Sequence, residues 1–389
     1  MKSRSLIQAS LYIHIPFCDS FCDYCDFFSV LKNTYKDDYI NIYLLAVIKD
    51  IYSQINYFGI NEIPTVYIGG GTPSVIGNKI SIILDALKSI PGFNPVEFTI
   101  EANLESLTEE FLCICRDGGV NRLSLGIQTF HEPSLITVNR GIGNCVSADF
   151  HGFSRIKDRI DLAIKYFPDS LSVDLITGLP FQDEEVALND IKKIMEINPS
   201  FVSLYSLTVE NGTVLEDKIK NKTVNMPSMD FADYLWLSGK ESLEKAGFEH
   251  YEISNFALKN KRSLHNTRYW KMQNWIGVGP AASGTIINEE TGTAKRYTYL
   301  QDIDKYIKEP HIQNAVYEEL DKITLIKESL LMGFRCKDGP NQELFNKRFG
   351  FSIEECIPRT LEKWEGMNKM MFLNKFISDA FKELDIKKN

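Results

Sequence analysis

The sequence predicts an α/β protein: an open, partial (β/α)6 barrel of the TIM type, joined to a smaller, mostly helical C-terminal domain. In the first 210 residues, short apolar runs alternate with helix-length segments, and several of these runs end at glycine, proline or a polar residue. Alternation of strands and helices implies a parallel sheet with right-handed crossovers. Six such units are present. A closed barrel of this type needs about eight, so we expect the barrel to stay open.

The strand candidates are short runs rich in apolar and β-branched residues. The intervening segments, such as Tyr35–Tyr57 and Lys79–Ile90, carry apolar residues at helical spacing. A further helix is expected over Met229–Ala246, with Ser228 as its N-cap, and a strand over His250–Phe256. The six strands of the barrel are predicted at Leu11–Ile15, Thr65–Ile68, Glu97–Glu101, Arg122–Ile127, Leu171–Ile176 and Phe201–Leu207.

The pattern changes after the barrel. The segment Ala257–Ser263 is polar and basic, as expected of a linker, and Asn288–Lys295 has the composition of a surface turn. We therefore divide the chain into a barrel domain (1–256), a connecting segment (257–315) and a helical C-terminal domain (316–389). The last part is predicted to contain helices over Leu320–Phe334, Asn341–Phe349 and Ile353–Gly366, and a hairpin over Met371–Ile377.

Composition restricts the class of protein. The chain has 389 residues, 44% of them hydrophobic and 24% charged, with a net charge of −9. These values are ordinary for a globular protein and give no overall attraction for nucleic acid. No apolar run reaches the roughly 18 residues of a membrane-spanning helix, and no signal peptide is recognised, so we expect a cytoplasmic protein without an integral membrane segment.

Three of the 8 cysteines, Cys18, Cys22 and Cys25, follow the first strand in the spacing C-x3-C-x2-C. In a reducing compartment such a group favours a metal or a catalytic role over disulfides, although cysteines also serve as small buried apolar residues. A structural zinc ion normally has four protein ligands, and only His14 lies near enough in sequence to supply the fourth. Three thiolates suit an iron–sulfur cluster that keeps one iron open for a ligand.

The stretch Tyr12-Ile13-His14-Ile15-Pro16-Phe17-Cys18, continued by Cys22-Asp23-Tyr24-Cys25, resembles the signature of the radical S-adenosylmethionine (SAM) superfamily. It is most similar to the branch that contains the oxygen-independent coproporphyrinogen III dehydrogenases and the HemW heme chaperones. The resemblance implies a [4Fe–4S] cluster on the three cysteines, with SAM on the fourth iron and Tyr12 and Tyr24 beside it. It also implies an electron donor such as flavodoxin or ferredoxin.

The triplet Gly69-Gly70-Gly71, followed by Thr72, ends the second strand. Taken alone it reads as a turn, but its place at a carboxyl strand end favours a site where backbone approaches a ligand. Later strands are followed by polar residues that belong either to the site or to its rim. By resemblance to the family, the SAM-binding residues are Gly69, Gly70, Gly71, Thr72, Glu101, Gln128, Arg140 and Asp174, with Asp174 assigned to the ribose hydroxyls.

Two features separate the branches of the family. The dehydrogenases carry a fourth cysteine at the position of Phe27, which favours the chaperones here. The stretch His265-Asn266-Thr267-Arg268-Tyr269-Trp270 matches their H-N-x-x-Y-W motif. A neutral imidazole can ligate heme iron and aromatic rings can cover the macrocycle, but a histidine beside aromatic residues is often structural.

The resemblance thus implies a heme chaperone that binds heme, as cargo, at His265, Tyr269 and Trp270, and passes it to an acceptor protein. The alternative is a coproporphyrinogen III dehydrogenase acting on a porphyrin precursor. An RNA-modifying enzyme is disfavoured by the acidic composition.

Overall fold

A computed structural model describes residues 7–141 and 153–388, without the side chains of 153–155 and 387–388. Its centre is a 12-stranded sheet in the order β11-β12-β10-β9-β8-β7-β6-β2-β13-β14-β15-β16. Six neighbouring strands, β2 to β10, are parallel and confirm the predicted barrel strands. Their bounds are β2 Ser10–Ile15, β6 Thr65–Gly70, β7 Glu97–Asn103, β8 Arg122–Gln128, β9 Leu171–Thr177 and β10 Phe201–Ser206.

Both edges of the barrel are extended by later segments. Strand β13 (Trp275–Val278) pairs parallel with β2, and β14 (Ser283–Asn288), β15 (Thr293–Thr298) and β16 (Val316–Leu320) continue antiparallel from it. On the other edge, β12 (Asn255–Ala257) pairs antiparallel with β10. The predicted single strand over His250–Phe256 is wrong, because β11 (Glu249–Glu252) turns back on β12 as a hairpin.

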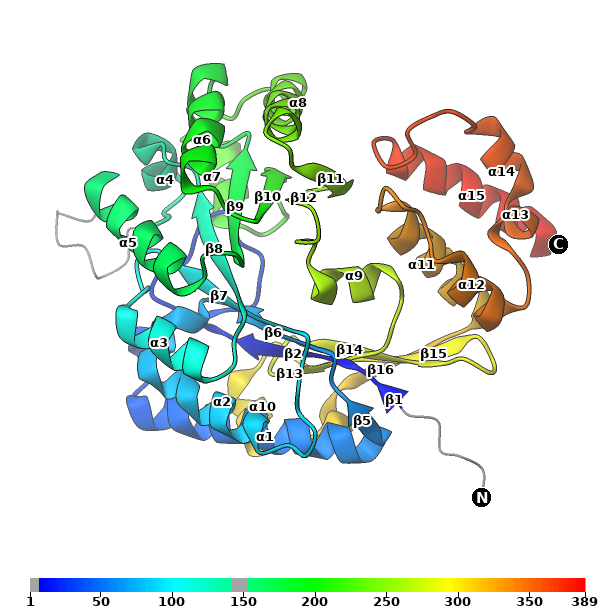
Figure 1. Ribbon diagram of the computed structural model, residues 1–389, viewed down its shortest axis with the longest axis horizontal. Helices are drawn as coiled ribbons and strands as arrows, with labels where there is room; N and C mark the ends of the chain where they lie inside the picture. Colours follow the sequence, from blue (N-terminus) through cyan, green and yellow to red (C-terminus); the bar gives the residue numbers. More distant parts are fainter. Residues whose placement is uncertain (1–6, 142–152, 389) are drawn as a thin grey trace.

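Helices line the outer side of the curved sheet, and Figure 1 shows α1, α2, α3, α5 and α6 along it. Strands and helices share one large apolar core. The segment after Arg140 falls mainly outside the described residues. The helices up to residue 308 are α1 Asp37–Phe58, α2 Ile80–Lys88, α3 Glu109–Asp117, α4 Glu132–Thr137, α5 Phe153–Tyr166, α6 Glu184–Ile197, α7 Val214–Lys220, α8 Met229–Lys245, α9 Leu264–Trp270 and α10 Ile303–Lys308.

The C-terminal part is mostly helical, as predicted, and has a core of its own. The expected hairpin over Met371–Ile377 is wrong: Leu373 begins a helix whose residues Phe376, Ala380 and Leu384 are buried at helical spacing. Strands β14 and β15 also contribute residues to this core, so the domain boundaries at 256 and 315 remain a prediction. The helices are α11 Lys322–Phe334, α12 Gln342–Phe349, α13 Ile353–Cys356, α14 Pro358–Lys363 and α15 Leu373–Lys388.

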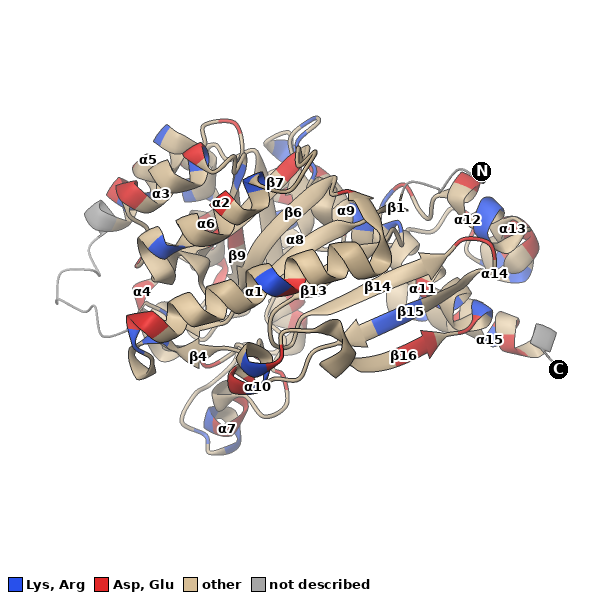
Figure 2. Ribbon diagram, turned by 90° about the horizontal axis from the view of Figure 1, so that it is seen from below, with Lys and Arg blue, Asp and Glu red and all other residues tan. Residues whose placement is uncertain are grey.

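Charged residues are spread along the helices. Figure 2 shows lysine and arginine interspersed with aspartate and glutamate, and no face in that view is basic throughout. Within the described part of the chain, no helix combines the length and the apolar character that crossing a membrane requires.

Candidate functional site

The cysteine loop leaves the barrel at the carboxyl end of β2. Its base is closed by β3 (Phe17–Cys18), which pairs with β4 (Val30–Leu31). Asp23 fixes the middle of the loop: its backbone N–H donates to the Val138 carbonyl at 2.9 Å, and its carboxylate forms an ion pair with Lys218 of α7. These contacts fix Asp23, which is buried, and thereby restrict the loop on either side of it, where Cys22 and Cys25 lie.

All three thiols line one cavity of about 510 Å³. This volume lies in the range that holds cofactors and small ligands, roughly 300–1,000 Å³. Four of the predicted SAM-binding residues, Gly70, Gly71, Thr72 and Arg140, line the same cavity. The structure therefore brings together residues from the first two strand ends and from the segment after α4, which lie far apart in sequence.

A chain of polar contacts joins two of the cysteines across this cavity. The Thr72 hydroxyl lies 3.5 Å from the Cys18 sulfur and accepts a hydrogen bond from the Asn103 side-chain amide at 3.0 Å. Asn103 Oδ1 in turn accepts from Arg140 at 2.8 Å, and another Arg140 nitrogen lies 3.5 Å from the Cys22 sulfur. Asn103 was missed in the sequence analysis.

The donor set fits a cluster better than a single zinc ion. Among the described residues, no group of three or more His, Cys, Asp or Glu side chains is arranged to hold one metal ion. Thiolates on a cubane go to three different irons, so they stand further apart than the ligands of one ion. His14 supplies no fourth ligand, because its ring nitrogens contact the Tyr12 hydroxyl at 3.0 Å and the Phe28 carbonyl at 2.9 Å.

The three cysteines differ in exposure: Cys18 and Cys22 are partly buried, whereas Cys25 is exposed. Burial raises the pKa of Cys18 to about 11, against the lowering effect of the Thr72 hydroxyl, and burial also raises the pKa of Cys25. Both thiols are therefore neutral in the protein alone, and a bound cation is needed to stabilise their ionised form. The guanidinium of Arg140 adds positive charge beside Cys22.

The glycine triplet allows strand β6 to pack closely on its neighbours. Gly70 has φ +112°, and a Cβ placed there would lie 2.4 Å from the His14 ring. A Cβ on Gly69 would lie 2.7 Å from the Glu101 carboxylate, which accepts a hydrogen bond from Gly70 N–H at 3.1 Å. Only Gly70 and Gly71 of the triplet line the cavity, while Gly69 lies behind them.

Two partly buried carboxyl groups come from β7 and β9. Burial raises the pKa of Glu101 to about 7, opposed by the hydroxyl of Tyr67, which donates at 2.6 Å, and assisted by the charge of Asp174. Burial likewise raises the pKa of Asp174, against hydrogen bonds with Ser203 and Ser124. The predicted residues Glu101 and Asp174 are thus close enough to influence each other, although β8 separates their strands.

The remaining predicted residues are not among those that line the cavity. Tyr24 packs on a small apolar cluster that contains Leu179 and is near Arg140. Tyr12 lies on β2, with its ring centre 6.3 Å from that of Tyr67. Gln128 ends β8 with the left-handed value φ 71° at a register shift in the sheet. This conformation is uncommon for a residue with a side chain and turns the chain away from the strand.

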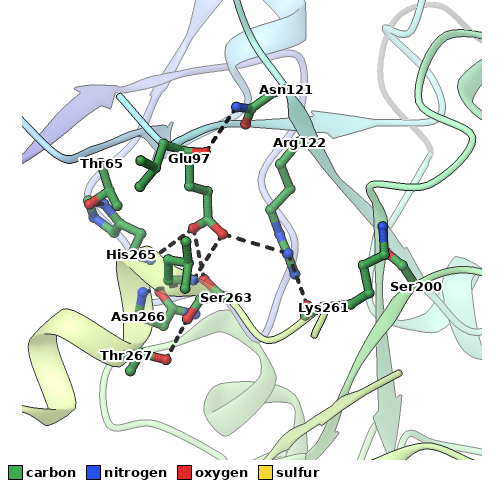
Figure 3. Close-up of polar contacts among 12 residues, drawn as sticks. Thr65, Glu97, Asn121, Arg122, Ser200, Lys261, Ser263, His265, Asn266 and Thr267 are labelled. Carbon is green, nitrogen blue, oxygen red and sulfur yellow. Dashed lines mark hydrogen bonds and ion pairs between the residues drawn. The ribbon is translucent and has the colours of Figure 1, made fainter. Parts of the chain in front are cut away.

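The H-N-x-x-Y-W motif lies at the opposite end of the strands, on α9. Its His265 contacts Thr65, the first residue of β6, whereas the cavity is built on Gly70, the last. At about 3.3 Å per residue, the two ends of β6 are roughly 16 Å apart. Figure 3 shows the His265 ring beside Thr65, among the contacts of Glu97.

His265 is fully buried and both of its ring nitrogens are engaged. Nδ1 lies 2.9 Å from the Thr65 hydroxyl and Nε2 lies 2.8 Å from the Tyr269 hydroxyl. Burial lowers the pKa of His265 to about 3, so the ring is neutral. An iron ion can reach either nitrogen only after one of these hydroxyls has moved away.

Glu97 organises the start of α9, as the dashed contacts in Figure 3 illustrate. Its carboxylate accepts from the backbone N–H groups of Leu264 and His265 at 2.9 and 2.8 Å. Arg122 approaches the same carboxylate at 3.7 Å and donates to the Lys261 carbonyl at 3.2 Å, while its Nη2 has no partner in the described structure. The motif therefore depends on a buried charge pair that the sequence analysis did not identify.

Comparisons with known proteins identify the family of this chain. The model of the radical SAM superfamily matches residues 12–194. Heme chaperone HemW of Lactococcus lactis is 33% identical over 89% of this chain and 86% of its own length. The mitochondrial radical S-adenosyl methionine domain-containing protein 1 of mouse is 31% identical over 85% of this chain and 74% of its own.

The fold also has a counterpart among solved structures. Coproporphyrinogen III oxidase HemN of Escherichia coli, described as a radical SAM enzyme, superposes with a TM-score of 0.77 over 97% of this chain and 90% of its own, at 20% identity. At that identity the likeness shows the fold alone. Together with the HemW relatives, which match nearly the whole length, it shows that this chain belongs to the radical SAM superfamily, in the branch related to HemW.

Proposed function

We propose that this protein is a heme chaperone that holds a [4Fe–4S] cluster and SAM at the carboxyl end of its barrel, binds heme as cargo and passes it to an acceptor protein. The observation that carries the proposal is that proteins named heme chaperone HemW match both halves of the chain. Phe27 supports it, because this ring is 67% exposed and lines the cavity at the position of the fourth cysteine of the dehydrogenases.

Cys18, Cys22 and Cys25 would ligate the cluster, and SAM would occupy the rest of the cavity beside Gly70, Gly71 and Thr72. When bound, a cluster reduced by a flavodoxin or ferredoxin would supply the electron for reductive cleavage of SAM. Arg140 stabilises negative charge on the thiolates. The cytoplasm provides the reducing conditions that free thiols need.

The resemblance assigns the heme to His265, Tyr269 and Trp270. In the conformation described above, the His265 nitrogens are occupied by Thr65 and Tyr269. Direct ligation by His265 therefore requires α9 to shift away from β6. The two parts of the proposal are separable, since the cluster and α9 lie at opposite ends of the barrel.

The test is anaerobic reconstitution with iron and sulfide, followed by iron analysis, a SAM-cleavage assay and heme titration on the same samples. We expect about four irons per chain, one heme per chain, and transfer of that heme to an apo-acceptor. Cys22→Ala is expected to lose the iron and keep the heme, whereas the control Cys113→Ala, altered at an exposed cysteine of α3, keeps both.

Zinc in place of iron would contradict the assignment of the cysteines. A protein that takes up no heme would contradict the chaperone role. If the protein takes up no heme but converts coproporphyrinogen III to protoporphyrinogen, the dehydrogenase function replaces the chaperone role.

A further inference from the structure

We propose that heme docks in the cavity between the barrel and the C-terminal helices, with the sulfur atoms of Cys336 and Met370 as its iron ligands and Lys369 as a partner for its propionates. This inference rests on the proposed function and specifies the place of the cargo. It does not require α9 to leave its position on β6.

The cavity is the right size for a macrocycle. It has a volume of about 850 Å³, against roughly 300–1,000 Å³ for pockets that hold cofactors and drug-sized ligands. One wall comes from α8 and β11, and the other from the ends of α11 to α14 and the loop 367–370. Figure 1 shows these two groups of elements facing each other.

Apolar side chains from both walls can cover the faces of a flat ligand. Phe248 lies on the barrel side and Phe334 on the helical side, together with Leu361 and Met367. Methionine side chains are flexible and polarisable, so they adapt to ligands of irregular shape. Met367 is 45% exposed, although it is the kind of residue that usually lies inside a protein.

The cavity also holds soft donors for iron. Cys336 and Met370 line it from two separate segments, and the Cys336 thiol makes no hydrogen bond in the described structure. Thiolate and thioether sulfurs are both established axial ligands of heme iron. His250 is less suited, because its ring is stacked on Phe256 at 4.5 Å and its Nε2 donates to the Ile253 carbonyl at 3.0 Å.

The charges at the rim leave one cation without a partner. Glu244 is paired with Lys240, Glu249 with Lys337, and Asp338 with Arg262. Lys369 lines the cavity and forms no ion pair among the residues that the structure describes. A carboxylate of heme that enters the cavity would therefore find an available ammonium group, whose attraction is strengthened by partial desolvation.

The cavity adjoins the H-N-x-x-Y-W motif without including it. Trp270 packs against Tyr251 with ring centres 5.8 Å apart, and Cys336 packs on the same small apolar cluster. The backbone of Cys336 also forms a bridge to Glu252 at the end of β11. The motif thus supports the wall that carries the proposed ligand, which gives it a role in heme binding while His265 stays buried.

The experiment compares heme titrations and magnetic circular dichroism spectra of the full-length wild type and its variants. Cys336→Ser and Met370→Leu should each bind heme at least tenfold more weakly, the first with loss of the thiolate signature and the second with loss of the thioether signature. Lys369→Glu, at the rim, should weaken binding without changing that signature. The matched controls are Cys113→Ser, Met229→Leu and Lys375→Glu, altered at exposed residues that do not line the cavity, which should behave as wild type.

His265→Ala distinguishes this inference from the proposed function. Under the cavity assignment, the variant retains the sulfur signature. If it loses the axial ligand while the Cys336, Met370 and Lys369 variants bind as wild type, the cavity is not the site and the chaperone role still stands. If the wild type takes up no heme, the chaperone role fails and the cavity assignment fails with it.

Discussion

At the scale of single residues, Asn103 connects the two halves of the cluster site. It lies between Thr72, which contacts Cys18, and Arg140, which contacts Cys22. The cysteines and the glycines could be identified from their spacing, because short motifs carry their own signal. Asn103 has no such motif, yet it stands two residues after Glu101 on β7. A period of two puts both side chains on one face of the strand, and this was the available signal.

Replacing Asn103 with alanine should leave the fold intact and weaken the cluster site. The change disconnects Thr72 from Arg140, and groups that orient ligands in this way are worth about 10- to 100-fold in affinity or activity. We expect Asn103→Ala to retain less iron after gel filtration and to cleave SAM more slowly by that factor. Asn78→Ala, changed at an exposed residue of η2 (Pro73–Lys79), is the control. Equal iron content and rate in both variants would show that the contact chain has no such role.

At the scale of elements, the two functional motifs sit on opposite ends of the same strands. Polar residues such as Asn103 end β7 at the cluster cavity, and Glu97 begins the same strand beneath α9. Helix α9 has only 7 residues, so its stability depends on what lies at its N-terminus. The Glu97 carboxylate and the Ser263 hydroxyl satisfy the free N–H groups there.

Glu97→Gln tests this dependence. In the variant, the NH2 group of glutamine would face a backbone N–H, so one hydrogen bond is lost. The negative charge opposite Arg122 is lost as well. We therefore expect the free energy of unfolding to fall by about 3 kcal/mol. Urea denaturation measures the loss, and hydrogen exchange should become faster over residues 264–270. The exposed Glu110→Gln variant should change neither quantity. Unaltered exchange in Glu97→Gln would mean that α9 is held by its other contacts.

Local sequence predicts an element correctly when the burial of that element is visible in the spacing of its own apolar residues. All six barrel strands could be predicted in this way, since each is a short, mostly buried segment rich in apolar and β-branched residues. The hairpin β11–β12 was taken for one strand, because its turn at Ile253-Ser254 contains no glycine or proline. The start of α15 was taken for a hairpin, because its apolar residues also suit short strands and only the later Ala380 and Leu384 reveal the helical period.

At the scale of the whole molecule, a buried acid joins the barrel to the added strands. Asp50 of α1 accepts hydrogen bonds from the hydroxyls of Tyr299 and Tyr306, at 2.8 and 2.9 Å, and from Gln54 at 3.2 Å. Burial raises the pKa of Asp50 to about 7 in spite of these donors. Helix α1 and the segment after β15 are thereby connected through one titratable group. Sequence patterns could not show it, because its partners lie about 250 residues away.

Asp50 should make the protein less stable as the pH rises. The unfolded carboxyl loses its proton near its usual pKa of 3.8, whereas the folded one keeps it up to about pH 7. Between these two pH values the unfolded state binds fewer protons than the folded state, so the free energy of unfolding falls as the pH rises. The fall amounts to at most about 4 kcal/mol, and above about pH 7 this contribution no longer changes. Asp50→Asn should make this slope shallower in denaturation measured from pH 4 to 8, although Glu101, whose pKa burial also raises, still contributes to it. Asp85→Asn, on the surface of α2, should retain the full slope. The same slope in both variants would assign it to another group.

The pairing of β13 with β2 has a consequence for how the protein matures. Strand β2, which leads into the cysteine loop, lies between β6 and β13, and β13 comes from the last third of the chain. During translation, the thiols near the N-terminus emerge long before the segment that completes their scaffold. A fixed loop for iron and sulfide is therefore complete only after most of the polypeptide has emerged from the ribosome, which places assembly of this centre late in synthesis or after it.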